Sequence, residues 1–218
     1  KTFENVYKSA GDNFYRDFYI RKRTNNIFIS SKLATSKDLF ISDKYNKWIT
    51  NVHSRGRVHL LRANHDSILT TSKTILEDNS TLNCRIDGLQ KYSPKRFIID
   101  KNLSIPVTSK IIRTANKIKT YIFYNLIDNI KLKKLKRLKV ITIRIDLKNN
   151  HLDFDKIIFF LRNKGFYRVF VEAGIEFNNF LLENNYINDF YHFYSDELFG
   201  NKGFHNAKFF FNKMNKIK

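Results

Sequence analysis

The chain has 218 residues, 42% of them hydrophobic, which is enough to bury the core of one medium-sized domain. Its single cysteine, Cys84, excludes a disulfide framework and a cysteine-based zinc site within the chain and favours a reducing, cytoplasmic compartment. The formal net charge of +20 raises nucleic acid as a partner, but the densest basic run, residues 131–139, has no aromatic residue to stack on bases and is expected to be a solvated face. No apolar stretch approaches the ~20 residues of a membrane helix, so we expect no membrane partner.

Runs rich in β-branched and aromatic residues predict the strands of a sheet. In the first half of the chain they cover residues 26–35, 67–70 and 96–99. A polar turn over residues 36–38 follows the first strand, and a helix is expected from Thr50, a capping residue, to about residue 65.

In the second half, predicted strands alternate with predicted helices. The strands cover residues 120–124, 139–145, 167–171 and 188–194, and the helices cover residues 155–163 and 177–184. Gly165 is suited to end the first of these helices because glycine tolerates the left-handed conformation. Strand, helix, strand in succession is a parallel crossover. We therefore predict an α/β fold with a mainly parallel central sheet flanked by helices.

Charged residues and a glycine lie near the ends of these strands, where open α/β sheets bind ligands. Arg62 and Arg85 flank the second predicted strand, and their guanidinium groups suit an anionic ligand. Gly174 precedes the last predicted helix; it allows close backbone approach beside a helix N-terminus that attracts phosphate, and an ordinary strand-to-helix turn is the alternative. Lys32 fits either a cleft or an exposed sheet edge, and the only tryptophan, Trp48, fits either a core or a ligand platform.

Short motifs occur in a fixed order along the chain. They are Lys-Leu-Ala-x-Ser-x-Asp from residue 32, Trp-Ile-Thr from 48, Leu-Arg-Ala-x-x-Asp-x-Ile-Leu from 61, Ser-x-Thr-Ile-Leu-x-Asp from 72, Leu-x-x-Arg from 82, Ile-Asp from 99 and Val-Glu-Ala-Gly from 171. This ordered set, between about residues 18 and 200, resembles the reductase domain of the bifunctional riboflavin-biosynthesis deaminase/reductase family. The resemblance implies the dihydrofolate-reductase-like fold of that family.

The resemblance also implies an NADPH-dependent oxidoreductase that reduces 5-amino-6-(5-phosphoribosylamino)uracil. The phosphoribosylamine would open to an imine or its equivalent, and NADPH would deliver a hydride to the sugar carbon. The implied cofactor contacts are Thr35, Trp48, Thr74, Asp78, Lys101, Gly174, Ile175 and Glu176. The implied substrate contacts are Asn46, Arg62, Leu82, Arg85 and Glu172. The expected catalytic residues, which position the reacting carbons and balance protons around the ribose hydroxyls, are Lys32, Asp78 and Glu172.

The sequence departs from the family pattern at several of these positions. Leu39 stands where the family has a glycine with positive φ, and Asn46 stands where it has serine. Ile175 replaces a proline, and the next residue, Glu176, places an acid beside the expected phosphate site. Lys101 replaces a small hydroxyl residue and fits either a contact to the 2′-phosphate of NADPH or an exposed lysine. These departures leave a catalytically silent relative as an alternative.

In the family, a zinc-dependent deaminase domain often precedes the reductase domain. Its His-x-Glu and Pro-Cys-x-x-Cys motifs do not occur here, so we expect residues 1–22 to be a tail or linker from such a domain and residues 23–218 to form the reductase domain. The family implies a homodimer, and residue 218 falls before its last strands. The alternatives are a dihydrofolate-reductase-like enzyme for another pyrimidine or pterin, and a basic nucleic-acid-binding module.

Overall fold

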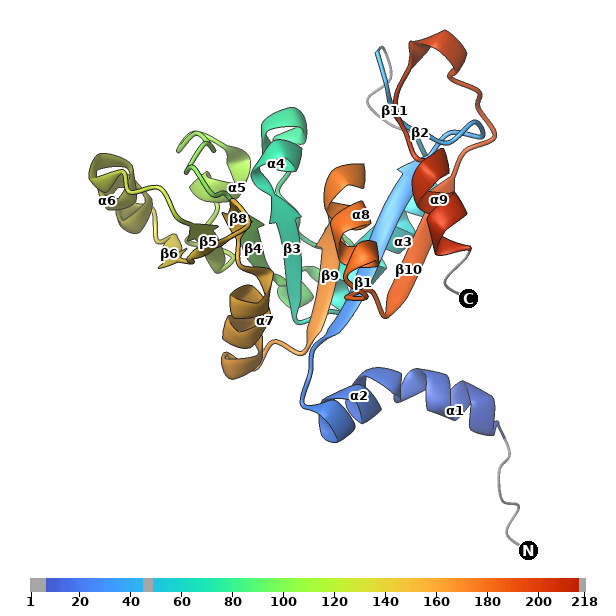
Figure 1. Ribbon diagram of the computed structural model, residues 1–218, viewed down its shortest axis with the longest axis horizontal. Helices are drawn as coiled ribbons and strands as arrows, with labels where there is room; N and C mark the ends of the chain where they lie inside the picture. The colour runs from blue at the N-terminus through green and yellow to red at the C-terminus, as the bar shows by residue number, and fades with distance from the viewer. Residues whose placement is uncertain (1–6, 45–48, 216–218) are drawn as a thin grey trace, which may run out of the picture.

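The computed structural model describes residues 7–44 and 49–215. Within these residues, seven strands form one sheet in the order β10-β1-β9-β3-β4-β5-β6, and every neighbouring pair is parallel (Figure 1). The strands of this sheet are β1 (Phe28–Thr35), β3 (Ser67–Thr71), β4 (Lys95–Ile99), β5 (Thr120–Tyr124), β6 (Ile141–Arg144), β9 (Arg168–Glu172) and β10 (Asp189–Tyr194). The predicted α/β fold with its mainly parallel sheet is confirmed.

Two short antiparallel ribbons lie outside the central sheet. One pairs β2 (Phe40–Asp43) with β11 (Gly203–Asn206), and the other is the hairpin of β7 (Leu147–Lys148) and β8 (His151–Leu152). The described helices are α1 (Lys8–Phe14), α2 (Arg16–Thr24), α3 (Val52–Ala63), α4 (Ser72–Asp78), α5 (Lys110–Arg113), α6 (Asn129–Arg137), α7 (Phe154–Asn163), α8 (Ile175–Glu183) and α9 (Lys208–Met214). None of them is long and apolar enough to cross a bilayer.

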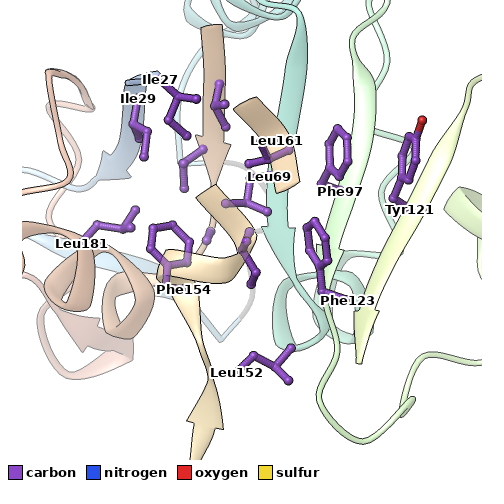
Figure 2. Close-up of a cluster of buried hydrophobic side chains, with 14 of the residues drawn as sticks. Ile27, Ile29, Leu69, Phe97, Tyr121, Phe123, Leu152, Phe154, Leu161 and Leu181 are labelled. Carbon is purple, nitrogen blue, oxygen red and sulfur yellow. The ribbon is translucent and has the colours of Figure 1, made fainter. Parts of the chain in front are cut away.

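Apolar side chains cover both faces of the sheet because parallel strands are buried on two sides. On one face, side chains of β3, β4, β5 and β9 pack against α3, α4, α5 and α6. On the other face, α7 and α8 pack over a cluster in which Phe97, Tyr121 and Phe123 come from neighbouring strands (Figure 2). The rings of Phe97 and Tyr121 are stacked with centroids 4.4 Å apart. The site residues at the strand ends therefore rest on a rigid support.

A buried arginine of β4 holds the segments before β4 and before β5 against the sheet. Arg96 is fully buried, and its guanidinium donates to the carbonyl oxygens of Thr81 (2.9 Å) and Ile118 (3.0 Å) and to the hydroxyls of Thr114 and Thr120. Burial lowers the pKa of Arg96 to about 10, so the group stays charged at neutral pH. The contact with Thr81 fixes the start of the segment that carries two of the predicted substrate residues.

Several predicted elements need correction. The helix expected from Thr50 begins at Val52, because Asn51 is the capping residue and its side chain accepts from the Ser54 backbone N–H. The basic run, not predicted to be helical, forms most of α6; its residues 133, 134, 136 and 137 are exposed, as expected of a solvated face, and Leu135 is buried. The strand expected from residue 139 begins at Ile141. Helices α1, α2, α4, α5 and α9 and the two ribbons were not predicted.

Candidate active site

The carboxyl ends of β1, β9 and β3 lie next to one another at one edge of the sheet. In the register of β1 and β9, Lys32 is the partner of Glu172. β3 pairs with β9 on the other side, and its last residue, Thr71, leads into α4. Three segments that the motifs singled out are therefore brought together where parallel sheets bind ligands.

A buried carboxylate with two cationic partners forms the centre of this edge. The Arg62 guanidinium, from the last turn of α3, donates to both oxygens of Glu172, with Nε–Oε1 at 2.5 Å and Nη2–Oε2 at 2.9 Å. The Lys32 ammonium lies 3.7 Å from Oε2. Burial raises the pKa of Glu172, but the charge and hydrogen bonds of Arg62, with a further contribution from Lys32, bring the pKa below its ordinary value. Glu172 is therefore an ionised acceptor.

A histidine that the motifs did not single out extends this cluster. His59 precedes Arg62 by three residues, so both side chains lie on one face of α3, and this spacing could have revealed it. Both reach the carbonyl oxygen of Asn83, at 3.0 Å from His59 Nδ1 and 3.0 Å from Arg62 Nη1. Burial and the charges of Arg62 and Arg85 lower the pKa of His59. A neutral imidazole and a guanidinium thus hold the segment of Asn83 against α3.

The predicted substrate residues of that segment face different surroundings. Leu82 has a positive φ of 49° and its side chain is buried in the core, so only its backbone is available to a ligand. The Arg85 side chain is exposed, and its Nη1 donates a long hydrogen bond of 3.5 Å to the Thr81 hydroxyl. Of the two arginines, Arg85 makes the fewer side-chain hydrogen bonds within the protein.

A cavity of about 630 Å³ opens at this edge of the sheet, between α4, α8 and the β7–β8 hairpin. Five of the predicted cofactor residues line it: Thr74, Lys101, Gly174, Ile175 and Glu176. Apolar walls come from Ile99, Leu152, Phe154 and Phe177. Its size and mixed lining are typical of a pocket for a small organic ligand.

Gly174 places an uncapped helix N-terminus at this cavity. It is the N-cap of α8 and has no side chain to bond the first backbone N–H groups, which helix geometry leaves without partners. Its φ is −69°, so glycine is not required by the backbone conformation. Instead, nothing lies within 4 Å of the place where a Cβ would project. The open space and the N–H groups suit a phosphate group.

A buried asparagine, also missed by the motifs, holds this turn in place. Asn178 is fully buried in the first turns of α8. Its Nδ2 donates to the carbonyl oxygens of Ala173 (3.0 Å) and Gly174 (3.1 Å), and its Oδ1 accepts from the Ser31 hydroxyl of β1. The turn between β9 and α8 is thus fixed relative to the strand that carries Lys32.

Comparisons with known proteins show the family of the chain. The sequence profile described as the RibD C-terminal domain matches residues 28–207. The chain belongs to this family. A relative named 5-amino-6-(5-phosphoribosylamino)uracil reductase, from Buchnera aphidicola subsp. Acyrthosiphon pisum, is 32% identical over 158 residues, covering 66% of this chain and 72% of the relative.

Solved RibD structures share the fold. RibD of Acinetobacter baumannii superposes with a TM-score of 0.75 at 21% identity, over 91% of this chain and 54% of that one. A deaminase/5-amino-6-(5-phosphoribosylamino)uracil reductase of Thermotoga maritima has a TM-score of 0.71 at 21% identity, over 89% and 52%. The expected dihydrofolate-reductase-like fold is confirmed. The chain spans about half the length of the first curated relatives it matches.

Two described residues to which the RibD resemblance gave a role, Thr35 and Asp78, do not line the cavity. Thr35 is fully buried, and its hydroxyl is 2.8 Å from His192 Nε2 of β10. Asp78 is exposed at the end of α4. Asn46 and Trp48 fall outside the described residues. The roles of these four residues stay predictions.

Two departures from the RibD pattern have structural counterparts. Leu39 adopts a positive φ of 67°, so the turn after β1 keeps a left-handed conformation without a glycine. The Asp38 carboxylate secures this turn by accepting from the Ser36 hydroxyl and from the backbone N–H groups of Phe199 (3.0 Å) and Gly200 (2.7 Å). Burial opposes ionisation of Asp38, but these hydrogen bonds lower its pKa to about 2. The second departure, Glu176, forms an ion pair with Lys73 of α4.

Proposed function

We propose that this chain is an NADPH-dependent reductase that converts 5-amino-6-(5-phosphoribosylamino)uracil to its ribitylamino product. The observation that carries this proposal is the position of β9. Its last residue, Glu172, lies in a cationic cluster beneath α3, and two residues later Gly174 lines the cavity between α4 and α8. A charged anchor for a substrate and a pocket for a dinucleotide therefore meet at one strand end.

The cavity fits the cofactor in its chemistry. The α8 N-terminus and Gly174 would hold the pyrophosphate, and the apolar residues around Ile99 and Phe177 would pack against a ring. Lys101, whose Nζ donates to the Asn150 carbonyl at 2.8 Å, is a candidate for a further phosphate group at the rim. When bound, the nicotinamide supplies the hydride.

The cationic cluster suits the substrate's phosphate and ribose. Because Arg62 is engaged with both oxygens of Glu172, it positions that carboxylate, and Arg85 is the arginine with donors available to a phosphate. Glu172 is ionised and accepts hydrogen bonds from ribose hydroxyls. Reduction of the opened sugar also needs one proton at the nitrogen, and the Lys32 ammonium, 3.7 Å from Glu172, is our candidate donor.

The test follows NADPH oxidation by its near-ultraviolet absorbance in the full chain, with the phosphorylated substrate and with its dephosphorylated analogue. Arg85→Ala should raise KM for the phosphorylated substrate about ten- to a hundredfold, since a hydrogen bond to a charged group is lost. It should leave KM for the analogue unchanged. Arg137→Ala, on the exposed end of α6, is the matched control.

Three outcomes separate the hypotheses. A folded wild-type chain that oxidises no NADPH with this substrate would overturn the proposal. Equal activity on the phosphate-free analogue would favour a dihydrofolate-reductase-like enzyme for another pyrimidine or pterin. Oxidation that depends on the phosphate and on Arg85 supports the reductase.

We propose the remaining features from the relatives. The RibD proteins are about twice as long as the matched part, so residues 1–22 would connect an upstream deaminase domain to a reductase domain of residues 23–218. From the family resemblance we also propose a homodimer in the cytoplasm, and the free, buried Cys84 is compatible with a reducing compartment.

A further inference from the structure

An ion pair joins the two walls of the cavity. Lys73 lies in the first turn of α4, Glu176 lies in the first turn of α8, and both line the cavity. The Lys73 ammonium donates to Glu176 Oε1 at 2.7 Å. The residues are 103 positions apart, but α4 and α8 follow the neighbouring strands β3 and β9 and begin at the same edge of the sheet (Figure 1).

Glu176 poses an electrostatic problem for the cofactor. It is the second residue of α8, where a carboxylate is favourable to the helix because it faces the positive end of the helix dipole. An anionic ligand that binds the N–H groups of the same turn would be repelled by this carboxylate. A cation at Glu176 removes the repulsion, and Lys73 is that cation.

We propose that Lys73 is a cofactor-binding residue of this chain, whose ammonium group neutralises Glu176 and donates a hydrogen bond to the pyrophosphate of a nicotinamide dinucleotide in the cavity. This inference rests on the proposed function. It adds to it a residue that neither the motifs nor the family resemblance assigned.

The geometry leaves Lys73 free to act in this way. An ammonium group has three N–H donors, and Glu176 accepts one hydrogen bond from Lys73. The side chains of Lys73 and Glu176 are 50% and 71% exposed, so the pair is solvated and holds neither group rigidly. The flexible lysine stem lets the ammonium turn toward the cavity while it stays beside Glu176.

The chain offers a matched control pair. Lys156 and Asp146 form an ion pair whose side chains are 51% and 72% exposed, and neither residue lines the cavity. Lys156→Met therefore removes the same charge from the same kind of pair without touching the proposed site.

The experiment measures NADPH binding to the full chain by the change in NADPH fluorescence, at low salt, with thermal unfolding to confirm the fold. Lys73→Met should raise Kd about tenfold, because a charge-assisted hydrogen bond is lost and Glu176 is left unopposed. Glu176→Gln should lower Kd about threefold, and the double variant should return to within about threefold of wild type. Lys156→Met should bind as wild type does.

Each result decides the inference. Rescue of Lys73→Met by Glu176→Gln supports it, because a merely structural lysine would change thermal stability and would gain nothing from loss of the acid. A Kd for Lys73→Met equal to that of wild type, or a weakened Kd that Glu176→Gln leaves unrescued, overturns it and leaves the proposed function standing. A wild-type chain that binds no NADPH overturns both.

Discussion

Replacing Arg62 by methionine tests whether the cationic cluster is organised around Glu172. Arg62→Met keeps most of the aliphatic part of the side chain but removes the guanidinium group that donates to both oxygens of the buried Glu172 carboxylate. Removing one partner of a buried ion pair costs about 3–5 kcal/mol. Because the Lys32 ammonium remains 3.7 Å from Glu172, we expect the lower end, about 3 kcal/mol at neutral pH.

The pH dependence of the free energy of unfolding tests this role of Arg62 more specifically than the size of the loss at one pH. In the wild type, the pKa of Glu172 is below its ordinary value, so the stability from this carboxylate is present above the ordinary value and is lost as the pH falls through the folded value. In Arg62→Met, burial without the main counter-charge raises the pKa of Glu172 above that of the unfolded chain. The variant is then most stable at acid pH and loses stability as the pH rises through the raised pKa. Its deficit against wild type should therefore shrink between about pH 8 and about pH 5.

Urea unfolding followed by circular dichroism at several pH values measures this deficit. Arg62→Met/Glu172→Gln is the control, because a neutral amide carries no buried charge and should recover most of the loss at neutral pH. A deficit below about 1 kcal/mol, or one that does not change with pH, would refute the view that Arg62 serves to hold Glu172 ionised.

Three further predictions concern the turns around the site. Gly174→Ala should leave the melting temperature unchanged, since a Cβ at this position meets no atom within 4 Å. It should raise the Kd of NADPH about tenfold, because the methyl group fills the space beside the α8 N–H groups. Unchanged binding in a fluorescence titration would show that the phosphate binds elsewhere. Leu39→Gly should raise the free energy of unfolding in urea by up to about 1 kcal/mol, because relief of a φ of 67° outweighs the entropy of glycine, and a loss of stability would contradict this. The pKa of Asp38 is about 2, so the advantage of wild type over Asp38→Asn should stay constant above the ordinary value and shrink as the pH falls toward about 2; melting curves would show an unchanging difference if the carboxylate were unimportant.

The strands of the sheet could be predicted because each is a compact apolar run between polar segments, such as the β5 run that ends at Tyr124. The short helices could not be predicted, because they contain too few apolar residues to show the roughly 3.6-residue hydrophobic period of a helix. In α6 only Leu135 is buried, within a run of lysines, and the fold rather than the pattern makes it helical. The error at Thr50 has a local cause, since Thr50 and Asn51 are adjacent capping residues and only the hydrogen bond to Ser54 distinguishes them.

The charged residues of the site could be found because they follow strand ends, but their pairings could not. Whether Arg62 faces Glu172 or solvent depends on the packing of α3 over β9, which joins residues 110 positions apart. Asn178 gave no signal, because a buried amide in a helix resembles any polar surface residue until its partners on β1 and the β9–α8 turn are known. Glu176 was noted as a departure from the family pattern, but Lys73 was not singled out, and only the order of β3 and β9 in the sheet makes the two residues a pair.

The two halves of the site are coupled by a short, rigid piece of chain. Side chains of β9 alternate between the faces of the sheet, so Glu172 faces α3 while its neighbour Val171 packs in the core under α7 and α8. Two residues later, Gly174 starts α8 at the cavity. Because Arg62 pins Glu172 and Asn178 pins the turn, neither half can shift without breaking hydrogen bonds of buried side chains. The proposed hydride transfer needs its two carbons held at a fixed distance and orientation, and this segment of β9 would supply that constraint through covalent geometry rather than through contacts made after binding.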